Sequence, residues 1–135
     1  MSTILGHAKA HIQEQSPTGK GAAGRLQKAL NDIKAENVNP YKVCYAVDVD
    51  ASKSTNIYEL LPTLTASRCA TGGYWLTNKG RKTTTSELLA AQGFDKDVMD
   101  LSSVSATDLG RAVGNSMSVP VVQAILANLL PSVGL

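Results

Sequence analysis

The sequence predicts an α+β fold: an N-terminal helix, a small β region and three C-terminal helices. An apolar stripe of helical period lies between residues 25 and 35, and apolar residues alternate with period two between residues 41 and 49. Two Ser/Thr-x-x-acid capping signals precede the helical last third. The stripe consists of Leu26, Ala29, Leu30 and Ile33, and the alternating set of Val43, Tyr45, Val47 and Val49.

Composition divides the 135 residues into four segments. Residues 1–24 are small and polar and are expected to be flexible. Residues 25–39 hold the first helix, which Pro40 ends because proline disfavours helix in the residue before it. Residues 40–82 form the β region, with short strands expected at 64–66 and 74–77 around a turn at Gly72 and Gly73. Residues 83–135 form the helical part.

Capping chemistry places the three C-terminal helices. Thr84 and Glu87 make a capping box that starts a helix over residues 85–92, and Gly93 suits the left-handed residue that ends it. Ser105 caps a second helix over residues 106–113. We expect a tight turn at 114–116, followed by a final helix over residues 119–130 with a proline in its first turn.

Charge and cysteine content narrow the class of protein. The net charge of +2 is too small to indicate nucleic-acid binding by itself, but residues 68–82 contain four basic residues and no acidic one. Two cysteines without a pairing pattern favour an intracellular protein, cytoplasmic in a bacterium or virus and nuclear in a eukaryote. The apolar run 119–130 is interrupted by Gln123 and Asn128 and is shorter than the roughly 20 residues of a membrane helix. We therefore expect no membrane span.

Two motifs in the last third occur together and in order. The first is Arg-x5-Glu-x4-Gln-Gly-Phe over residues 81–94, and the second is Gly-Asn-Ser-x-x-Val-Pro over residues 114–120. The pair resembles the last two sequence motifs of the DNA (cytosine-5) methyltransferases. Pro-Thr-Leu-Thr over residues 62–65 is similar to a segment of that family's target recognition region, so the resemblance covers about residues 40–135.

The resemblance implies an incomplete enzyme. The family's methyl-donor loop, its Pro-Cys-Gln nucleophile and its Glu-Asn-Val strand should precede these motifs. We therefore expect the C-terminal part or subunit of a DNA cytosine-5 methyltransferase, whose whole would be an α/β Rossmann-like enzyme that uses S-adenosylmethionine. The catalytic cysteine and glutamate would lie outside this chain, on an N-terminal catalytic half that is the expected partner.

The resemblance also implies roles for individual residues. Asn115, Ser116 and Met117 would close the S-adenosylmethionine pocket, which the N-terminal half shares. Double-stranded DNA would be contacted by residues of the basic β region. A third set would be structural and would brace the recognition region. The DNA-facing set is Thr63, Thr65, Arg68, Lys79 and Arg81, and the structural set is Glu87, Gln92, Gly93, Phe94 and Gly114.

The residues alone leave other interpretations open. Residues 63–73 could form a plain surface hairpin, and residues 114–116 a helix connector. A base could stack on Tyr74 or Trp75, although alternation puts one of them in the core. The alternative functions are a non-catalytic DNA-binding module and a small interaction subunit whose last helix docks on a partner.

Several short motifs are too incomplete to indicate a site. Gly19-x-Gly21-x-x-Gly24 lacks a preceding strand, and the calcium-loop pattern that starts at Asp48 has Lys53 where a glycine is needed. His7 and His11 lack a third ligand, so no metal is expected. Cys44 and Cys69 are expected to pack, and Glu36-Asn-Val lies at the end of a helix and not after a strand.

Overall fold

The computed structural model describes residues 17, 19 and 21–135, so most of the predicted flexible segment 1–24, with His7 and His11, lies outside the described residues. The described chain is α+β, as predicted. It forms two compact units. The first takes the chain up to Thr63 and Gly73–Thr83, and the second takes Leu64–Gly72 and Thr84–Leu135.

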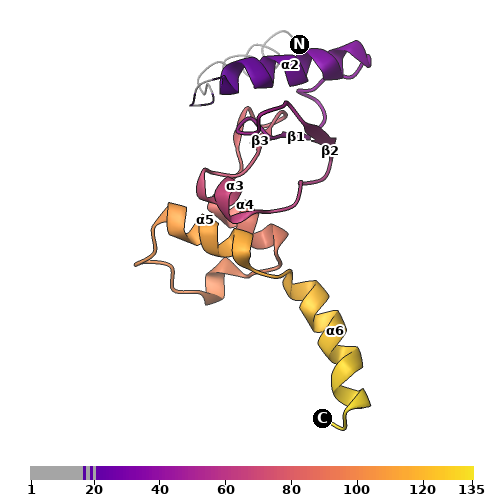
Figure 1. The fold of residues 1–135 in the computed structure, drawn as a ribbon, viewed down its shortest axis with the longest axis vertical. Coiled ribbons are helices and arrows are strands. Elements are labelled where there is room, and N and C mark those ends of the chain that lie inside the picture. The colour runs from indigo at the N-terminus through magenta and orange to yellow at the C-terminus, as the bar shows by residue number, and fades with distance from the viewer. Residues whose placement is uncertain (1–16, 18, 20) are drawn as a thin grey trace, which may run out of the picture. The chain divides into compact units, whose positions relative to one another are not determined.

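In its described residues, the first unit contains helix α2 and a small antiparallel sheet (Figure 1). The sheet order is β2-β1-β3-β4, with Ala46 of β1 opposite Ile57 of β2 on one side and Leu76 of β3 on the other. Leu76 in turn pairs with Arg81 of β4. The elements are α2 Ala22–Ala35, β1 Tyr45–Val47, β2 Asn56–Tyr58, β3 Trp75–Leu76 and β4 Arg81–Lys82.

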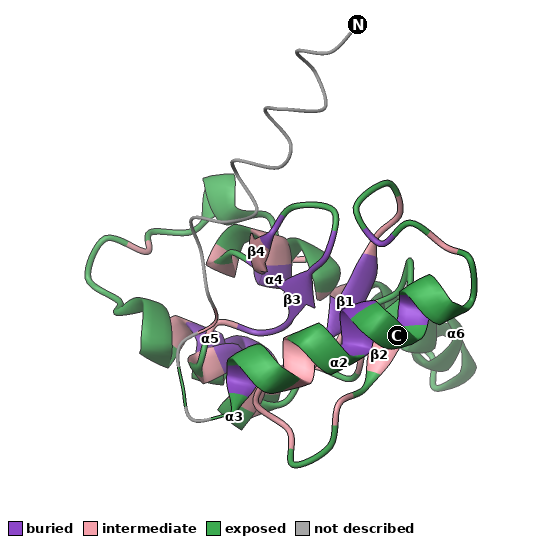
Figure 2. Cartoon of the chain, turned by 90° about the horizontal axis from the view of Figure 1, so that it is seen from above, coloured by how far each residue is buried: buried purple, intermediate pink, exposed green. Residues whose placement is uncertain are grey.

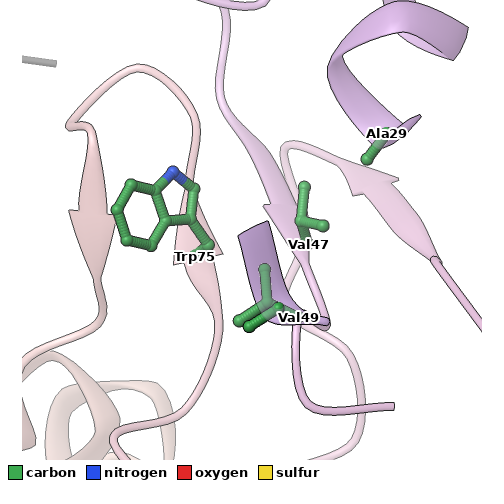
Figure 3. Packing of buried hydrophobic residues seen from close by; sticks show 5 residues of the cluster. Ala29, Val47, Val49 and Trp75 are labelled. Carbon is green, nitrogen blue, oxygen red and sulfur yellow. The ribbon is translucent and has the colours of Figure 1, made fainter. Parts of the chain in front are cut away.

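Helix α2 packs its apolar stripe into the first core. Ala29, Leu30 and Ile33 are buried as predicted, and Leu26 is partly buried against the same cluster. The helix begins three residues earlier than expected, because Gly21 takes a left-handed conformation (φ 80°) and Ala22 is buried. Figure 3 shows side chains of this core, which joins α2 to β1 and β3. The cluster is Ala22, Ala29, Val47, Val49 and Trp75.

The predicted strand over residues 41–49 is only partly correct, since β1 is limited to Tyr45–Val47. All three of its residues are buried, so both faces of the strand are covered. The alternating apolar residues of the sequence therefore do not distinguish a buried face from a solvent-exposed face here. Beyond the strand, the Asp48 carboxylate accepts hydrogen bonds from the amides of Asp50 and Ala51, which turns the chain away from the sheet.

The second unit is helical. Its core consists of Cys69, Leu88, Leu89 and Val113, with Leu64, Phe94, Leu101 and Leu109 packed around it. The Thr84–Glu87 capping box predicted for α4 is present, with both reciprocal hydrogen bonds formed. The elements are α3 Ala66–Ala70, α4 Thr85–Ala91, the 3-10 turn Lys96–Val98, α5 Ala106–Asn115 and α6 Val119–Ser132.

Two local predictions in this unit are wrong. Residues 64–66 are not a strand: Thr65 is the N-cap of α3, and its hydroxyl accepts a hydrogen bond from the Arg68 amide. Gly114 and Asn115 belong to the last turn of α5, and the break between α5 and α6 lies at residues 116–118. The helix continues through Gly114 because that residue packs directly on a neighbouring backbone.

Helix α6 differs from the rest of the unit in exposure. None of its residues is buried, and Figure 2 shows it coloured as exposed over most of its length. By length and composition alone, the stretch Ala106–Ser132 could cross a membrane, with a mean hydropathy of 1.3. That stretch is α5 and α6 with a break between them, 10 and 14 residues long, and each is shorter than the roughly 20 residues that a span needs.

Candidate functional site

The bend between α5 and α6 presents polar groups at the surface of the second unit. Asn115 is exposed, Ser116 is half-buried, and the Met117 side chain is 67% exposed. The Asn115 carboxamide has no hydrogen-bond partner among residues 21–135. A carboxamide offers both a donor and an acceptor, so this bend can contact a polar ligand directly.

The shape of the bend is held by hydrogen bonds from two sides. The Ser116 amide and hydroxyl both donate to the Val113 carbonyl, at 3.1 and 2.7 Å. From the end of α4, the Gln92 side-chain nitrogen donates to the carbonyls of Val113 (3.2 Å) and Ser116 (3.3 Å). The Gln92 carbonyl accepts from the Val119 amide at 2.8 Å, which ties down the first residue of α6.

Gly93 and Phe94 anchor the other side of the same junction. Gly93 is left-handed (φ 83°), as predicted for the residue that ends α4. A Cβ on Gly93 would lie 2.5 Å from Cδ of Pro120, so the glycine also makes room for the start of α6. Phe94 packs on the second core, and its amide donates to the Leu89 carbonyl at 3.0 Å.

Helix α5 packs against α3 through two glycines. A Cβ on Gly110 would lie 2.2 Å from the Cys69 carbonyl oxygen, and one on Gly114 would lie 2.3 Å from the carbonyl carbon of Thr65. No side chain fits at either position without moving a backbone. The sequence analysis did not identify Gly110 as a contact residue, although the spacing of two glycines four positions apart is a recognisable signal for a close helix contact.

Two of the five predicted DNA-facing residues lie in the second unit, at the start of α3. Thr65 is exposed and its hydroxyl caps the helix, with Ser67 Oγ at 3.4 Å. Arg68 is half-buried. Because α3 rests on α5 at Gly114, these residues and the bend are supported by the same helix.

The other three predicted DNA-facing residues lie in the first unit. Thr63 is exposed, and its carbonyl accepts a 2.6 Å hydrogen bond from the Tyr74 hydroxyl. Lys79 is exposed in the turn between β3 and β4, and a guanidinium nitrogen of Arg81 donates to the Lys82 carbonyl. The structure therefore divides the five between the units.

Tyr74 and Trp75 are both buried, with 2% and 4% of their surface exposed. The interpretation of either ring as a base-stacking platform is therefore wrong. Both strand faces are covered at this point, so alternation does not leave one of the two rings outside.

The first unit also contains an ion pair that the sequence analysis did not anticipate. Lys82 Nζ lies 2.5 Å from an Asp50 carboxylate oxygen, and both side chains are about 20% exposed. Asp50 is the third position of the calcium-loop pattern that starts at Asp48, and its carboxylate is paired with the Lys82 ammonium group. Among residues 17, 19 and 21–135, no three His, Cys, Asp or Glu side chains are grouped closely enough to hold a metal ion.

Cys69 is not placed for nucleophilic chemistry. Cys69 is buried in the second core, and burial raises the pKa of its thiol despite an opposing hydrogen bond with the Thr65 backbone. Cys44 is half-buried in the first unit. A raised pKa lowers the thiolate fraction at neutral pH, which is the opposite of what a catalytic thiol needs.

Comparison of the chain with protein-family models, with curated proteins and with solved structures finds no match.

Proposed function

We propose that this chain is the C-terminal part or subunit of a DNA (cytosine-5) methyltransferase. The main observation behind this proposal is the bend at Asn115 and Ser116, which lies at the surface between α5 and α6. Hydrogen bonds from the Gln92 side chain hold this bend in place. The three residues come from the two motifs on which the resemblance depends. A surface carboxamide with no partner among the described residues is suited to a polar ligand such as the adenosyl group of S-adenosylmethionine.

In this proposal the chain supplies binding surfaces and the N-terminal half supplies the chemistry. A cysteine thiolate of that half attacks carbon 6 of a cytosine that has been flipped out of the duplex. Carbon 5 then takes the methyl group from the sulfonium of S-adenosylmethionine, which leaves as S-adenosylhomocysteine. Loss of the proton from carbon 5 expels the thiolate. Asn115, Ser116 and Met117 close the donor pocket against that half.

The exposure of α6 supports a missing partner surface. The helix has no charged side chain, and its apolar residues Val121, Ile125 and Leu129 are each more than half exposed. An apolar helix without burial indicates an interaction surface. The N-terminal catalytic half is the occupant we propose, because α6 follows directly on the bend that the same half would cover.

The DNA-facing role is supported by the chemistry of two exposed residues, Thr65 and Lys79, and of half-buried Arg68. Thr65 and Arg68 lie on one short helix, and Lys79 lies in an exposed turn between two strands. Hydroxyl, guanidinium and ammonium groups are the usual donors to phosphate oxygens. We propose that these residues contact the duplex backbone.

Complementation tests the proposal. The chain is mixed with the separately produced N-terminal half of a cytosine-5 methyltransferase that retains its methyl-donor loop and its Pro-Cys-Gln nucleophile. Transfer of tritiated methyl groups from S-adenosylmethionine to duplex DNA is then measured. We expect transfer only with both components, and loss of transfer with Asn115→Ala.

A matched pair of variants checks the role of α6 in the same assay. Ile125→Asp should abolish complementation, whereas Gln123→Asp, on another face of the helix, should retain most of it. Duplex binding by the chain with no transfer in any mixture would favour the DNA-binding module. Binding to the N-terminal half without transfer or donor binding would favour the interaction subunit.

A further inference from the structure

Gln92 contacts the bend from outside it, and each of its polar groups on that side has a defined partner. The carbonyls near the end of a helix have no partner within the helix and must be satisfied otherwise. One hydrogen of the Gln92 side-chain amide goes to the Ser116 carbonyl. The other goes to the Val113 carbonyl, which also accepts from the Ser116 amide and hydroxyl. Both partners are acceptors, so only the nitrogen of the carboxamide can face them.

The backbone that carries this side chain is itself fixed. The backbone amide of Gln92 donates to the backbone carbonyls of Leu88 and Leu89, two residues of the second core. Gly93 ends the helix immediately afterwards. The Gln92 carbonyl holds the Val119 amide. Gln92 therefore connects a rigid helix end to both sides of the bend.

We propose that Gln92 is a positioning residue that holds the bend in its binding shape before any ligand or partner arrives. Such preorganisation raises affinity because the cost of ordering the bend is not paid on binding. This role differs from bracing the recognition region, which the resemblance implies for Gln92. The statement that the ordered bend receives S-adenosylmethionine rests on the proposed function, whereas the statement that Gln92 orders it does not.

The test compares the wild-type chain with Gln92→Met, which keeps the side-chain length and removes both donors. Hydrogen exchange measured by NMR reports on two amides. The Ser116 amide lies in the bend, and the Val119 amide bonds to the Gln92 backbone, which the substitution retains. We expect the protection of Ser116 to fall about tenfold and that of Val119 to stay within about twofold.

Donor binding is followed by titration with S-adenosylmethionine after the separately produced N-terminal half has been added, using the Asn115 and Ser116 amide shifts. The half-saturating concentration should rise about tenfold in Gln92→Met, as expected for the loss of two partly buried hydrogen bonds. The control is Gln123→Met, which removes an exposed glutamine of α6 and should change neither measurement.

A second variant keeps the test valid if Gln92→Met unfolds. Gln92→Glu has the same shape, has no donor when ionised, and regains one O–H donor when its carboxyl is protonated. Acidification through that pKa should restore part of the Ser116 protection in Gln92→Glu and none in wild type. A purely space-filling role would show no such pH dependence.

The outcomes separate the two proposals. Unchanged Ser116 protection in both variants overturns the positioning role. Reduced protection leaves the positioning role standing whatever the donor does. If the wild-type chain mixed with the N-terminal half does not respond to millimolar S-adenosylmethionine, the result counts against the proposed function. A wild-type response that Gln92→Met matches in full overturns the link between order in the bend and donor affinity.

Discussion

Helices α5 and α6 follow one another in the chain, yet the protein covers only one of them. Helix α5 buries Gly110 and Val113 and rests on α3, while its charged residues Asp108 and Arg111 pair at the surface. Helix α6 is longer, has no charged side chain and buries none of its residues. Helix α5 thus buries its apolar face within its own unit, whereas α6 keeps most of its apolar side chains exposed.

Leucine truncation in the two environments gives the largest expected difference. Leu88→Ala removes a side chain that packs with Val113 of α5, and it should lower the free energy of unfolding by about 3 kcal/mol. Leu129→Ala, on exposed α6, should change it by less than about 0.5 kcal/mol. Urea denaturation measures both. A comparable loss from Leu129→Ala would mean that α6 is buried in solution, and the contrast between the helices would fail.

The glycine contact between α5 and α3 gives the next largest effect. Gly114→Ala places a methyl group against the Thr65 backbone and should cost about 2 kcal/mol of stability through overpacking. Gly24→Ala is the matched control. Gly24 lies within α2 with no atom near its Cβ position, so alanine there should stabilise the protein by up to about 1 kcal/mol. Thermal unfolding followed by circular dichroism distinguishes the opposite signs.

Helix caps provide a smaller effect. Thr84→Ala breaks the capping box of α4 and should cost about 1 kcal/mol. Ser118, at the same position before α6, makes no side-chain capping bond, so Ser118→Ala should cost less than about 0.5 kcal/mol. Chemical denaturation of the two variants in parallel gives the comparison, which equal losses would contradict.

The last prediction concerns the reactivity of the two cysteine thiols and not the free energy of unfolding. Burial and a raised pKa should make Cys69 react with a thiol reagent at least about tenfold more slowly in the folded chain than in denaturant. Cys44, which is half-buried, should react first. Mass spectrometry of partly modified chain identifies the site. Faster modification of Cys69 would show that the core beside α5 opens readily.

Local sequence patterns were sufficient where the interactions are local. The capping box at Thr84 and Glu87, the left-handed Gly93 and the apolar stripe of α2 involve residues within a few positions of each other, and all three are present in the structure. The α+β class follows from the same patterns. The order of helices in the last third was also predicted correctly.

Predictions failed where distant residues decide the conformation. Residues 64–66 were expected to form a short strand before the turn at Gly72 and Gly73, but the Thr65 hydroxyl caps a helix that packs on α5. Gly114 appeared to be a turn residue because glycine is frequent there, but contact with the Thr65 backbone requires the absence of a side chain. Burial of both Tyr74 and Trp75 likewise depends on sheet partners that are far apart in the sequence.

The candidate site was predicted from a motif resemblance and not from geometry. Asn115 and Ser116 were named from a motif, and their exposure agrees with a contact role without establishing one. The hydrogen bonds from Gln92 could not be predicted, because the residue is more than 20 positions away in the sequence and belongs to another helix. Its position in the other motif was the only available signal.

The distribution of charge along the chain has one further consequence. From Gly114 to Leu135 there is no charged side chain, whereas the four basic residues of the stretch 68–82 precede this region. Ionic strength therefore acts differently on the two surfaces: added salt screens attraction between basic side chains and phosphates but leaves apolar association of α6 intact. A salt titration can separate a complex held by the first surface from one held by the second without changing a single residue.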